Sequence, residues 1–189
     1  MKTISISGSL RENVGKKDAK QLRKKGLVPA NIYGGSQQYH IALDEKQLQK
    51  AVFTPEVYLV ELNLDGITKQ AIIQEVQYHP VTDKILHVDF LEVLPEKPNT
   101  VKIPIKITGN SIGVLKGGKL EKKFRLLKVK GLVSDIPDSI TLDISELDIN
   151  QSIKVNDLQY EKLTFLDPAN SIIIRVVPTR AVQENAPQA

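Results

Sequence analysis

The stretch VYLVELNLDGITKQAIIQEVQY, residues 57–78, decides the fold of the first half of the chain. Two runs rich in apolar and β-branched residues lie on either side of the dipeptide Asp65-Gly66. Asp-Gly between two such runs is the strongest short-range signal for a β-hairpin, because a two-residue hairpin turn commonly needs positive φ at both positions. A third apolar run, 85–94, follows. We therefore predict a sheet built around this hairpin.

Two short helices are predicted upstream of the hairpin. The basic stretch 16–25 has the composition of a helix and is followed by Gly26, a residue type that commonly ends helices. In the second helix Asp44 can cap the N-terminus, Gln47 stands three residues further on, and Pro55 follows the last residues with helical spacing.

Two other segments are predicted to be extended. Residues 3–7, TISIS, alternate polar and apolar side chains in the manner of an edge strand. Residues 29–35, PANIYGG, predict an extended segment that ends in a glycine turn.

The character of the sequence changes at Pro95. Two prolines in PEKPN, residues 95–99, interrupt the hydrogen bonding of helix and strand, so we expect a linker here. Beyond it, short apolar runs are separated by Gly, Pro, Asn and Asp, which predicts a small sandwich or barrel-like β domain; the runs are 101–107, 125–129, 140–144, 152–155 and 172–177. The expected fold is mainly β with a few helices: an α+β domain over residues 1–94, an all-β domain over 95–178 and a disordered tail over 179–189.

Charge is distributed very unevenly along the 189 residues, although the net charge is only +4. Residues 1–26 hold eight Lys or Arg against two acidic residues, which gives +6, and residues 116–130 hold seven against one, again +6. Residues 131–170 hold two against eight, which gives −6. A charge run is usually a solvated face, and two basic runs raise the expectation of a polyanionic partner moderately.

Several function classes are disfavoured by composition. The chain has no cysteine, which excludes disulfides, thiolate catalysis and cysteine-ligated zinc, and it has three histidines. No window approaches the ~18 apolar residues of a membrane span, and the first residues show no signal-peptide core. The glycine pairs 34–35 and 117–118 lack the spacing of a phosphate-binding loop. We expect a soluble, cytoplasmic protein with no cofactor and no small-molecule substrate.

The stretch LHVDF, residues 86–90, is the constellation most able to carry chemistry. His87 and Asp89 stand two apart on a predicted strand, so they share one face about 6.6 Å apart, while Val88 and Phe90 face a core. The pair can be a solvent-facing polar pair and no more. A metal site would need a third ligand that cannot be located, and catalysis would need a nucleophile that is not nearby, so an enzyme is not expected.

RNA binding accounts for more of these features together. Lys and Arg of the basic helix can neutralise phosphates, Tyr33 offers a ring for stacking, and His87 and Asp89 can hydrogen-bond bases or 2′-hydroxyls. Tyr33 alone is weak evidence, because a tyrosine beside a glycine turn is as often a residue at the edge of a core. We therefore predict an RNA-binding surface in the first ~94 residues.

The same residues carry a resemblance to a known family. The first half of the chain contains the motifs Arg11-x-x-x-Gly15-Lys16-x-x-Ala19-x-x-Leu22-Arg23-x-x-Gly26-x-Val28-Pro29-Ala30-x-x-Tyr33-Gly34, Val76-Gln77-x-His79-Pro80 and Leu86-His87-Val88-Asp89-Phe90. Through these three motifs it resembles the bacterial large-subunit ribosomal protein family L-twenty-five. The second half resembles the extra C-terminal domain of the long form of that family, often called general stress protein Ctc, through Gly109-x-x-x-Gly113-x-x-x-Gly117-Gly118-x-Leu120, Ile136-Pro137-x-x-Ile140-x-x-Asp143-Ile144 and Leu166-Asp167-Pro168.

The resemblance implies a ribosome-associated structural protein without catalytic activity. Its N-terminal domain would be a β-barrel with helices that binds 5S ribosomal RNA (5S rRNA), next to neighbouring components of the large ribosomal subunit, and its C-terminal domain would be all β. The implied RNA-binding residues are Arg11, Lys16, Lys20, Arg23, Tyr33, His87 and Asp89. The alternative is a stress-related protein-interaction module that acts through the C-terminal β domain.

One position departs from the family pattern. Family members commonly carry two consecutive arginines before Leu22, whereas this sequence has Lys20 and Gln21. One positive charge is missing and a bidentate donor is replaced by a point charge, so we expect weaker phosphate binding with the same choice of RNA.

Overall fold

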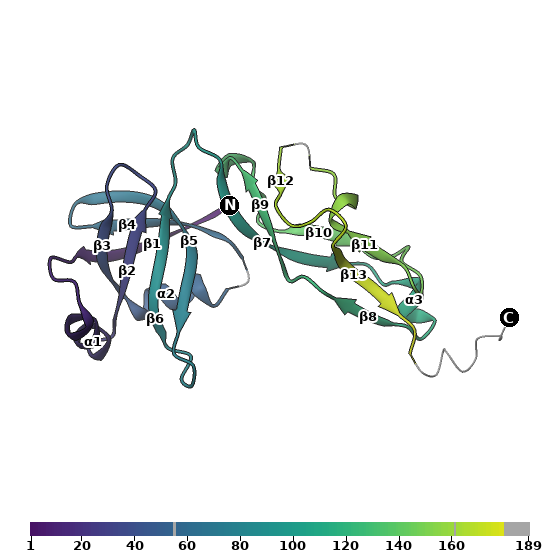
Figure 1. Cartoon of the computed structure of the whole chain (residues 1–189), viewed down its shortest axis with the longest axis horizontal. Coiled ribbons are helices and arrows are strands. Elements are labelled where there is room, and N and C mark those ends of the chain that lie inside the picture. Colours follow the sequence, from purple (N-terminus) through teal and green to yellow (C-terminus); the bar gives the residue numbers. More distant parts are fainter. Residues whose placement is uncertain (55, 161, 180–189) are drawn as a thin grey trace. The chain divides into compact units, whose positions relative to one another are not determined.

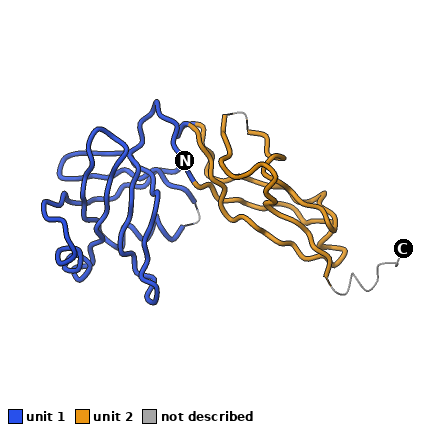
Figure 2. The backbone as a smooth tube through the Cα atoms, in the orientation of Figure 1, with its two compact units in different colours: residues 1–101, 132–134 blue, residues 102–131, 135–189 orange. Residues whose placement is uncertain are grey.

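The computed structural model describes residues 1–54, 56–160 and 162–179. The chain folds as two compact units (Figures 1 and 2): Met1–Val101 together with Leu132–Ser134, and Lys102–Gly131 together with the described residues from Asp135 onward. The end of the first unit lies a few residues beyond the predicted linker at 95–99. The division into domains over residues 1–94 and 95–178 with a tail over 179–189 stays a prediction.

The first unit is a closed six-stranded barrel with two helices. Its strands are β1 (Lys2–Leu10), β2 (Leu27–Tyr33), β3 (Tyr39–Asp44), β4 (Tyr58–Leu64), β5 (Ile67–Tyr78) and β6 (Ile85–Glu92), in the order β1-β3-β2-β6-β5-β4. The helices are α1 (Lys16–Lys24) and α2 (Glu45–Val52). The fold class predicted from the sequence is confirmed for this part of the chain.

The predicted hairpin joins β4 and β5. Asp65 has φ of 41° and Gly66 has φ of 93°, so both turn residues adopt the left-handed conformation that the Asp-Gly signal predicts. The strands pair antiparallel, with Leu64 opposite Ile67 and Leu59 opposite Ile72.

The N-terminal strand differs from its prediction. We expected residues 3–7 to form an edge strand, but β1 pairs antiparallel with β3 and parallel with β4, and so closes the barrel. The alternation itself is correct, because Ile6 is fully buried while Ser5 and Ser7 are exposed. Local alternation cannot reveal that a strand has two neighbours, because the second neighbour lies far away in the sequence.

The barrel interior holds one continuous apolar core. Fully buried side chains come from every strand, and Leu48 of α2 joins them; the core includes Ile6, Ile32, Ile41, Leu43, Leu62, Val88 and Phe90. Asp44 caps α2, and its carboxylate accepts hydrogen bonds from the backbone N–H groups of Lys46 and Gln47, as predicted. At about 25 cal/mol per Å² of buried apolar surface, this core is the main source of the barrel's stability.

The second unit contains two sheets in its described residues. A four-stranded sheet has the order β10-β7-β9-β12 and a three-stranded sheet has the order β11-β13-β8. Their strands are β7 (Asn99–Thr108), β8 (Lys119–Lys122), β9 (Leu126–Gly131), β10 (Ile140–Asp143), β11 (Ser152–Lys154), β12 (Thr164–Phe165) and β13 (Ile172–Val177). A four-residue helix, α3 (Ile112–Leu115), and two short 3-10 turns, Val133–Asp135 and Val155–Asp157, accompany them.

The predicted tail, residues 179–189, lies outside the described residues except for Thr179. Its hydroxyl donates a hydrogen bond to the carbonyl oxygen of Gly117 at 2.8 Å.

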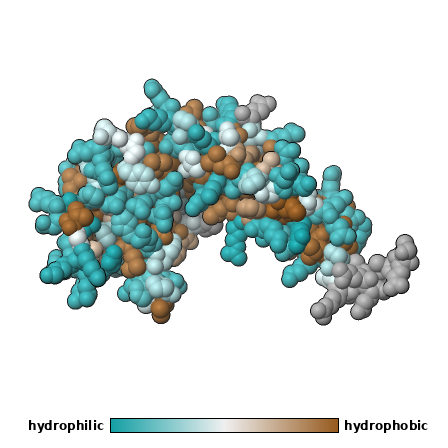
Figure 3. Space-filling model, in the orientation of Figure 1, coloured by the Kyte–Doolittle hydropathy of each residue, from teal (hydrophilic) through white to brown (hydrophobic). Residues whose placement is uncertain are grey.

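On the face drawn in Figure 3, hydrophobic residues reach the surface in patches that are interrupted by hydrophilic ones.

Candidate nucleic-acid interface

The basic helix α1 is attached to the outside of the barrel by its C-terminal turn. Arg23 Nε donates a hydrogen bond to the carbonyl oxygen of Leu86, on β6, at 3.0 Å. Gly26, with φ of 77°, follows the helix and lets the chain turn directly into β2. Lys16 and Lys20 are exposed. The helix therefore presents cations to solvent from a fixed position.

Arg11 occupies a different environment from the one expected of a phosphate-binding residue. Its Nη2 atom lies 2.6 Å from Asp18 Oδ2, its side chain is only 8% exposed, and Nη2 also donates to the carbonyl oxygen of Asn13. In the described part of the chain its Nε atom is buried without a hydrogen-bond partner. Arg11 therefore holds the connection that leads into α1, and a direct contact with RNA stays a prediction.

The predicted division of faces on β6 is confirmed. Val88 and Phe90 are fully buried in the barrel core, while the side chains of His87 and Asp89 lie on the outside and are 21% and 23% exposed. His87 Nδ1 lies 3.5 Å from Asp89 Oδ1. The contact becomes an ion pair when the imidazole is protonated.

Neighbouring strands extend this outer surface. Asp89 is opposite Asn31 of β2 and Glu75 of β5, and His87 is opposite Gln77. Residues opposite one another in a sheet project to the same side. We call this surface the polar strand face; it consists of Asn31, His40, Glu75, Gln77, His87 and Asp89.

Four residues of the polar strand face were missed by sequence reasoning, namely Asn31, His40, Glu75 and Gln77. Asn31 lies opposite His40 of β3, and His40 Nδ1 is 2.8 Å from Asn31 Oδ1. The available signal was the alternation in β2, where Asn31 stands between the buried residues Ala30 and Ile32. That pattern marks Asn31 as outward-facing, but only the strand order brings it to Asp89.

Tyr33 lies two residues beyond Asn31 on the same side of β2 and is exposed. Partial burial raises the pKa of its phenol, and the negative charges of Asp89 and Glu75 raise that pKa further. The hydroxyl therefore stays protonated at neutral pH and can act as a hydrogen-bond donor.

A pocket of about 300 Å³ lies where α1 meets the polar strand face. Four of the seven predicted residues line it, namely Arg11, Lys16, Arg23 and His87, and Asn31 and His40 contribute as well. Lys20, Tyr33 and Asp89 do not line it, although Asp89 pairs with Asn31 and lies beside His87. The fold thus places cations next to groups that can hydrogen-bond bases and sugars.

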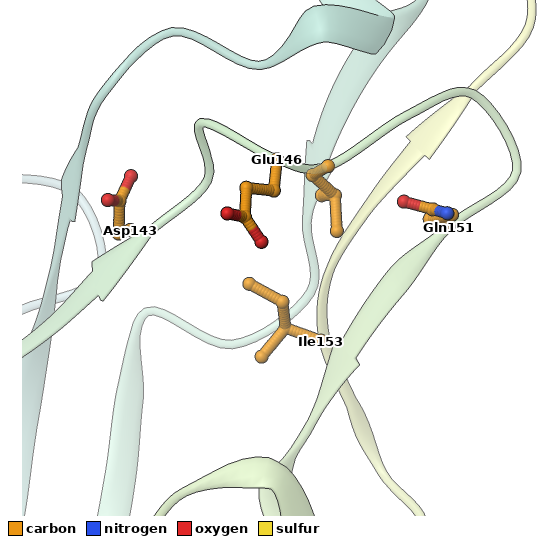
Figure 4. A pocket seen from close by; sticks show the side chains of 5 residues that line it. Asp143, Glu146, Gln151 and Ile153 are labelled. Atoms are coloured by element: carbon orange, nitrogen blue, oxygen red, sulfur yellow. The ribbon is translucent and has the colours of Figure 1, made fainter.

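A larger pocket, of about 620 Å³, lies in the second unit and has the opposite charge. Its lining includes Asp143, Glu146 and Gln151 (Figure 4). The pKa of Asp143 is lowered by hydrogen bonds from the hydroxyl and the backbone N–H of Ser145, so its carboxylate is ionised at neutral pH. Ionised carboxylates repel phosphates, so the walls of this pocket do not favour a polyanion.

The described residues show neither a metal-binding cluster nor a membrane-spanning helix. Among residues 1–54, 56–160 and 162–179, no group of three or more His, Asp or Glu side chains is arranged to hold a metal ion. Within the same residues no helix has the length and apolarity that a membrane span requires.

The first unit belongs to the class of closed β-barrel proteins that carry a basic helix beside a row of outward-facing polar side chains. Comparison with known proteins identifies the family within this class. Residues 6–90 match the model of the Ribosomal L25p family, and residues 98–180 match the model described as Ribosomal protein TL5, C-terminal domain. The chain belongs to the Ribosomal L25p family, whose members are structural proteins of the ribosome and not enzymes.

Similarity to curated relatives extends over the whole chain. A relative from Porphyromonas gingivalis is 40% identical over 185 residues, which cover 97% of this chain and 96% of the relative. Relatives from Phocaeicola vulgatus and Amoebophilus asiaticus are 38% and 40% identical, cover 100% of this chain, and are themselves covered to 99% and 96%. All three are named "Large ribosomal subunit protein bL25".

Proposed function

We propose that the protein is a structural constituent of the large ribosomal subunit and binds 5S rRNA through its barrel unit. The proposal rests on one observation: the pocket between α1 and the polar strand face, where Lys16, Arg23 and His87 meet. Cations alone would bind any RNA, whereas cations beside a rigid row of hydrogen-bonding groups can also discriminate between RNA structures.

In the proposed mechanism the two parts of the site have different tasks. The cations of α1 neutralise backbone phosphates and orient the RNA. His87 and Asp89 donate and accept hydrogen bonds along the shallow minor groove of a helix or internal loop, where RNA presents base edges and 2′-hydroxyls. No bond is made or broken. The partners are 5S rRNA and neighbouring large-subunit components, which makes the protein ribosome-associated in the cytoplasm.

The first experiment compares the full-length protein on 5S rRNA and on an unrelated structured RNA of similar length, at two salt concentrations. Phosphate attraction weakens steeply with salt and is the same for both RNAs, so only specific contacts sustain a preference. We expect 5S rRNA to bind more tightly at both salt concentrations. Equal affinities that fall together would overturn the proposal and favour a protein partner.

The second experiment tests the two tasks separately. Lys20→Ala should weaken binding to both RNAs equally and reduce the slope of log affinity against log salt by about 1. Asp89→Asn should reduce the preference for 5S rRNA by about 1 to 3 kcal/mol with little change in that slope. Lys50→Ala, at an exposed position of α2, and Asp83→Asn, at the β5–β6 tip, are the matched controls. Indistinguishable effects of Lys20→Ala and Asp89→Asn would contradict this division.

A further inference from the structure

The outer face of the four-stranded sheet in the second unit carries a cluster of lysines. On β7, Lys102 and Lys106 are exposed while Val101, Ile103 and Ile105 are buried. On the neighbouring strand β9, Lys128 and Lys130 are exposed while Leu127 and Val129 are buried. Alternate residues of adjacent strands thus project four ammonium groups to one side. We call Lys102, Lys106, Lys128 and Lys130 the lysine face.

The basic run 116–130 divides into cations with partners inside the protein and cations without them. Lys116 pairs with Asp148 at 2.5 Å, Lys123 pairs with Glu121 at 2.9 Å, and Lys122 Nζ donates to the carbonyl oxygen of Ile105 at 2.9 Å. Lys128 and Lys130 have no ion pair or side-chain hydrogen bond within the described residues, and the same is true of Lys102. The charges of Lys102, Lys128 and Lys130 are therefore available to a partner.

Other residues on this side of the sheet leave the positive charge largely uncompensated. Thr141 of β10 is opposite Lys106, and Thr164 of β12 is opposite Lys130. Asp143, further along β10, projects to the same side, and its carboxylate accepts two hydrogen bonds from Ser145. Lys102, Lys128 and Lys130 against one aspartate leave +2 on the surface.

We propose that the lysine face binds the phosphate backbone of RNA, as a second contact independent of the pocket in the barrel unit. Phosphates follow one another at short regular intervals along a nucleic acid, so Lys128 and Lys130, about 7 Å apart along β9, can each contact one in many registers. Lys102 and Lys106 are about 13 Å apart along β7 and add to the positive charge. An acidic protein surface is a less suitable partner for the lysine face than RNA. Its carboxylates are normally interspersed with positive side chains, which would repel the lysines. Lysine is a point charge that reads no sequence, so this contact adds affinity and leaves the choice of RNA unchanged.

The test uses the full chain and a fluorescein-labelled RNA hairpin of unrelated sequence. All variants carry Lys16→Gln and Lys20→Gln, which weaken the barrel site, and binding is followed by fluorescence anisotropy between about 50 and 200 mM salt. Adding Lys128→Gln and Lys130→Gln should reduce the slope of log affinity against log salt by about 1.5 to 2. The affinity near 0.1 M salt should fall roughly tenfold or more.

Two control variants show whether the reduced salt slope comes from the lysine face and from its charge. Lys119→Gln with Lys154→Gln removes the same charge from exposed positions of the other sheet and should leave the slope within error of the parent. Lys128→Arg with Lys130→Arg keeps the charge and should retain the slope.

An unchanged slope in the variant with Lys128→Gln and Lys130→Gln would overturn the proposal and direct attention to a protein partner. An equal reduction of the slope in the variant with Lys119→Gln and Lys154→Gln would overturn it as well. Because the hairpin is unrelated to 5S rRNA and the barrel site is weakened throughout, the outcome does not depend on whether the barrel prefers 5S rRNA.

Discussion

Arg23 of α1 donates its Nε–H to the carbonyl oxygen of Leu86, and so joins the basic helix to the residue that directly precedes His87. The bond links the two parts of the candidate site, the cations of α1 and the polar strand face. Because the helix cannot shift along β6 without breaking it, the distance between cations and hydrogen-bonding groups is set before any ligand binds. Preorganisation of this kind lowers the cost of binding.

Replacement of Arg23 by lysine tests this link. Arg23→Lys keeps the positive charge but removes the planar guanidinium that reaches Leu86, so the helix should lose its fixed position. We expect binding of 5S rRNA to weaken by roughly fivefold, equivalent to one hydrogen bond of about 1 kcal/mol, with an unchanged salt slope. Lys24→Arg, on the same helix, is the control. An affinity equal to that of the natural protein would show that the bond to Leu86 does not fix the helix for binding.

The buried guanidinium of Arg11 makes a second prediction, on stability. Asp18→Asn removes the carboxylate that lies 2.6 Å from Arg11 Nη2 and leaves a mostly buried charge without its ion partner. The free energy of unfolding should fall by about 1 to 3 kcal/mol. Urea denaturation followed by circular dichroism measures the change, with Asp83→Asn at the exposed β5–β6 tip as the matched control. Equal stability of the two variants would show that Arg11 needs no partner.

The phenol of Tyr33 reports the charge of the polar strand face. Its pKa is raised by partial burial and by the charges of Asp89 and Glu75, so removing one of those charges should lower it. Asp89→Asn should therefore move the pKa of Tyr33 down towards that of free tyrosine. Carbon-13 NMR of tyrosine-labelled protein resolves the five tyrosines during a titration to alkaline pH. An unchanged Tyr33 pKa would place its hydroxyl away from Asp89.

An ion pair between β5 and β6 gives a pH-dependent prediction. Lys69 Nζ lies 2.7 Å from Glu92 Oε1, and the Glu92 side chain is only 8% exposed. Gly35 makes room for this carboxylate, since a Cβ atom there would lie 1.9 Å from Glu92 Oε2. Lys69→Met leaves the carboxylate buried without its cation, and should cost about 1 to 2 kcal/mol at neutral pH because the pair is partly exposed.

The sign of the pH dependence follows from the pKa of Lys69. The hydrogen bond to Glu92 raises that pKa in the folded protein. The pair therefore contributes its full stability below the unfolded pKa, near 10.4, and loses it as pH rises through the higher folded pKa. The stability difference between the natural protein and Lys69→Met should shrink above about pH 10. Lys46→Met, on the exposed side of α2, should show no such trend.

Features encoded by adjacent residues could be predicted from the sequence. The hairpin turn at Asp65 and Gly66, the cap at Asp44 and the two faces of β6 each depend on a few neighbouring positions. Turn chemistry, capping and strand alternation act over that range, so a single sequence is sufficient to recognise them.

Features that depend on distant pairing could not be predicted. Asn31 and His40 join the polar strand face only because β2 lies between β3 and β6, and the parallel register of β2 with β6 connects positions far apart in the chain. The ion pair of Arg11 was missed for a related reason, because a cation in a basic segment is normally expected to face solvent. In both cases the deciding partner cannot be identified from the residue's own neighbours.

The parallel pairing of β1 with β4 also governs how the protein must fold. Lys2 is opposite Tyr58 and Gly8 is opposite Leu64, so the first strand to leave the ribosome has no partner on that side until β4 has been synthesised. Contacts over such a separation form slowly, and β1 offers an unpaired edge in the meantime. A nascent chain that stalls before β4 is therefore a template for strand exchange with another copy, and rapid completion of β4 protects it.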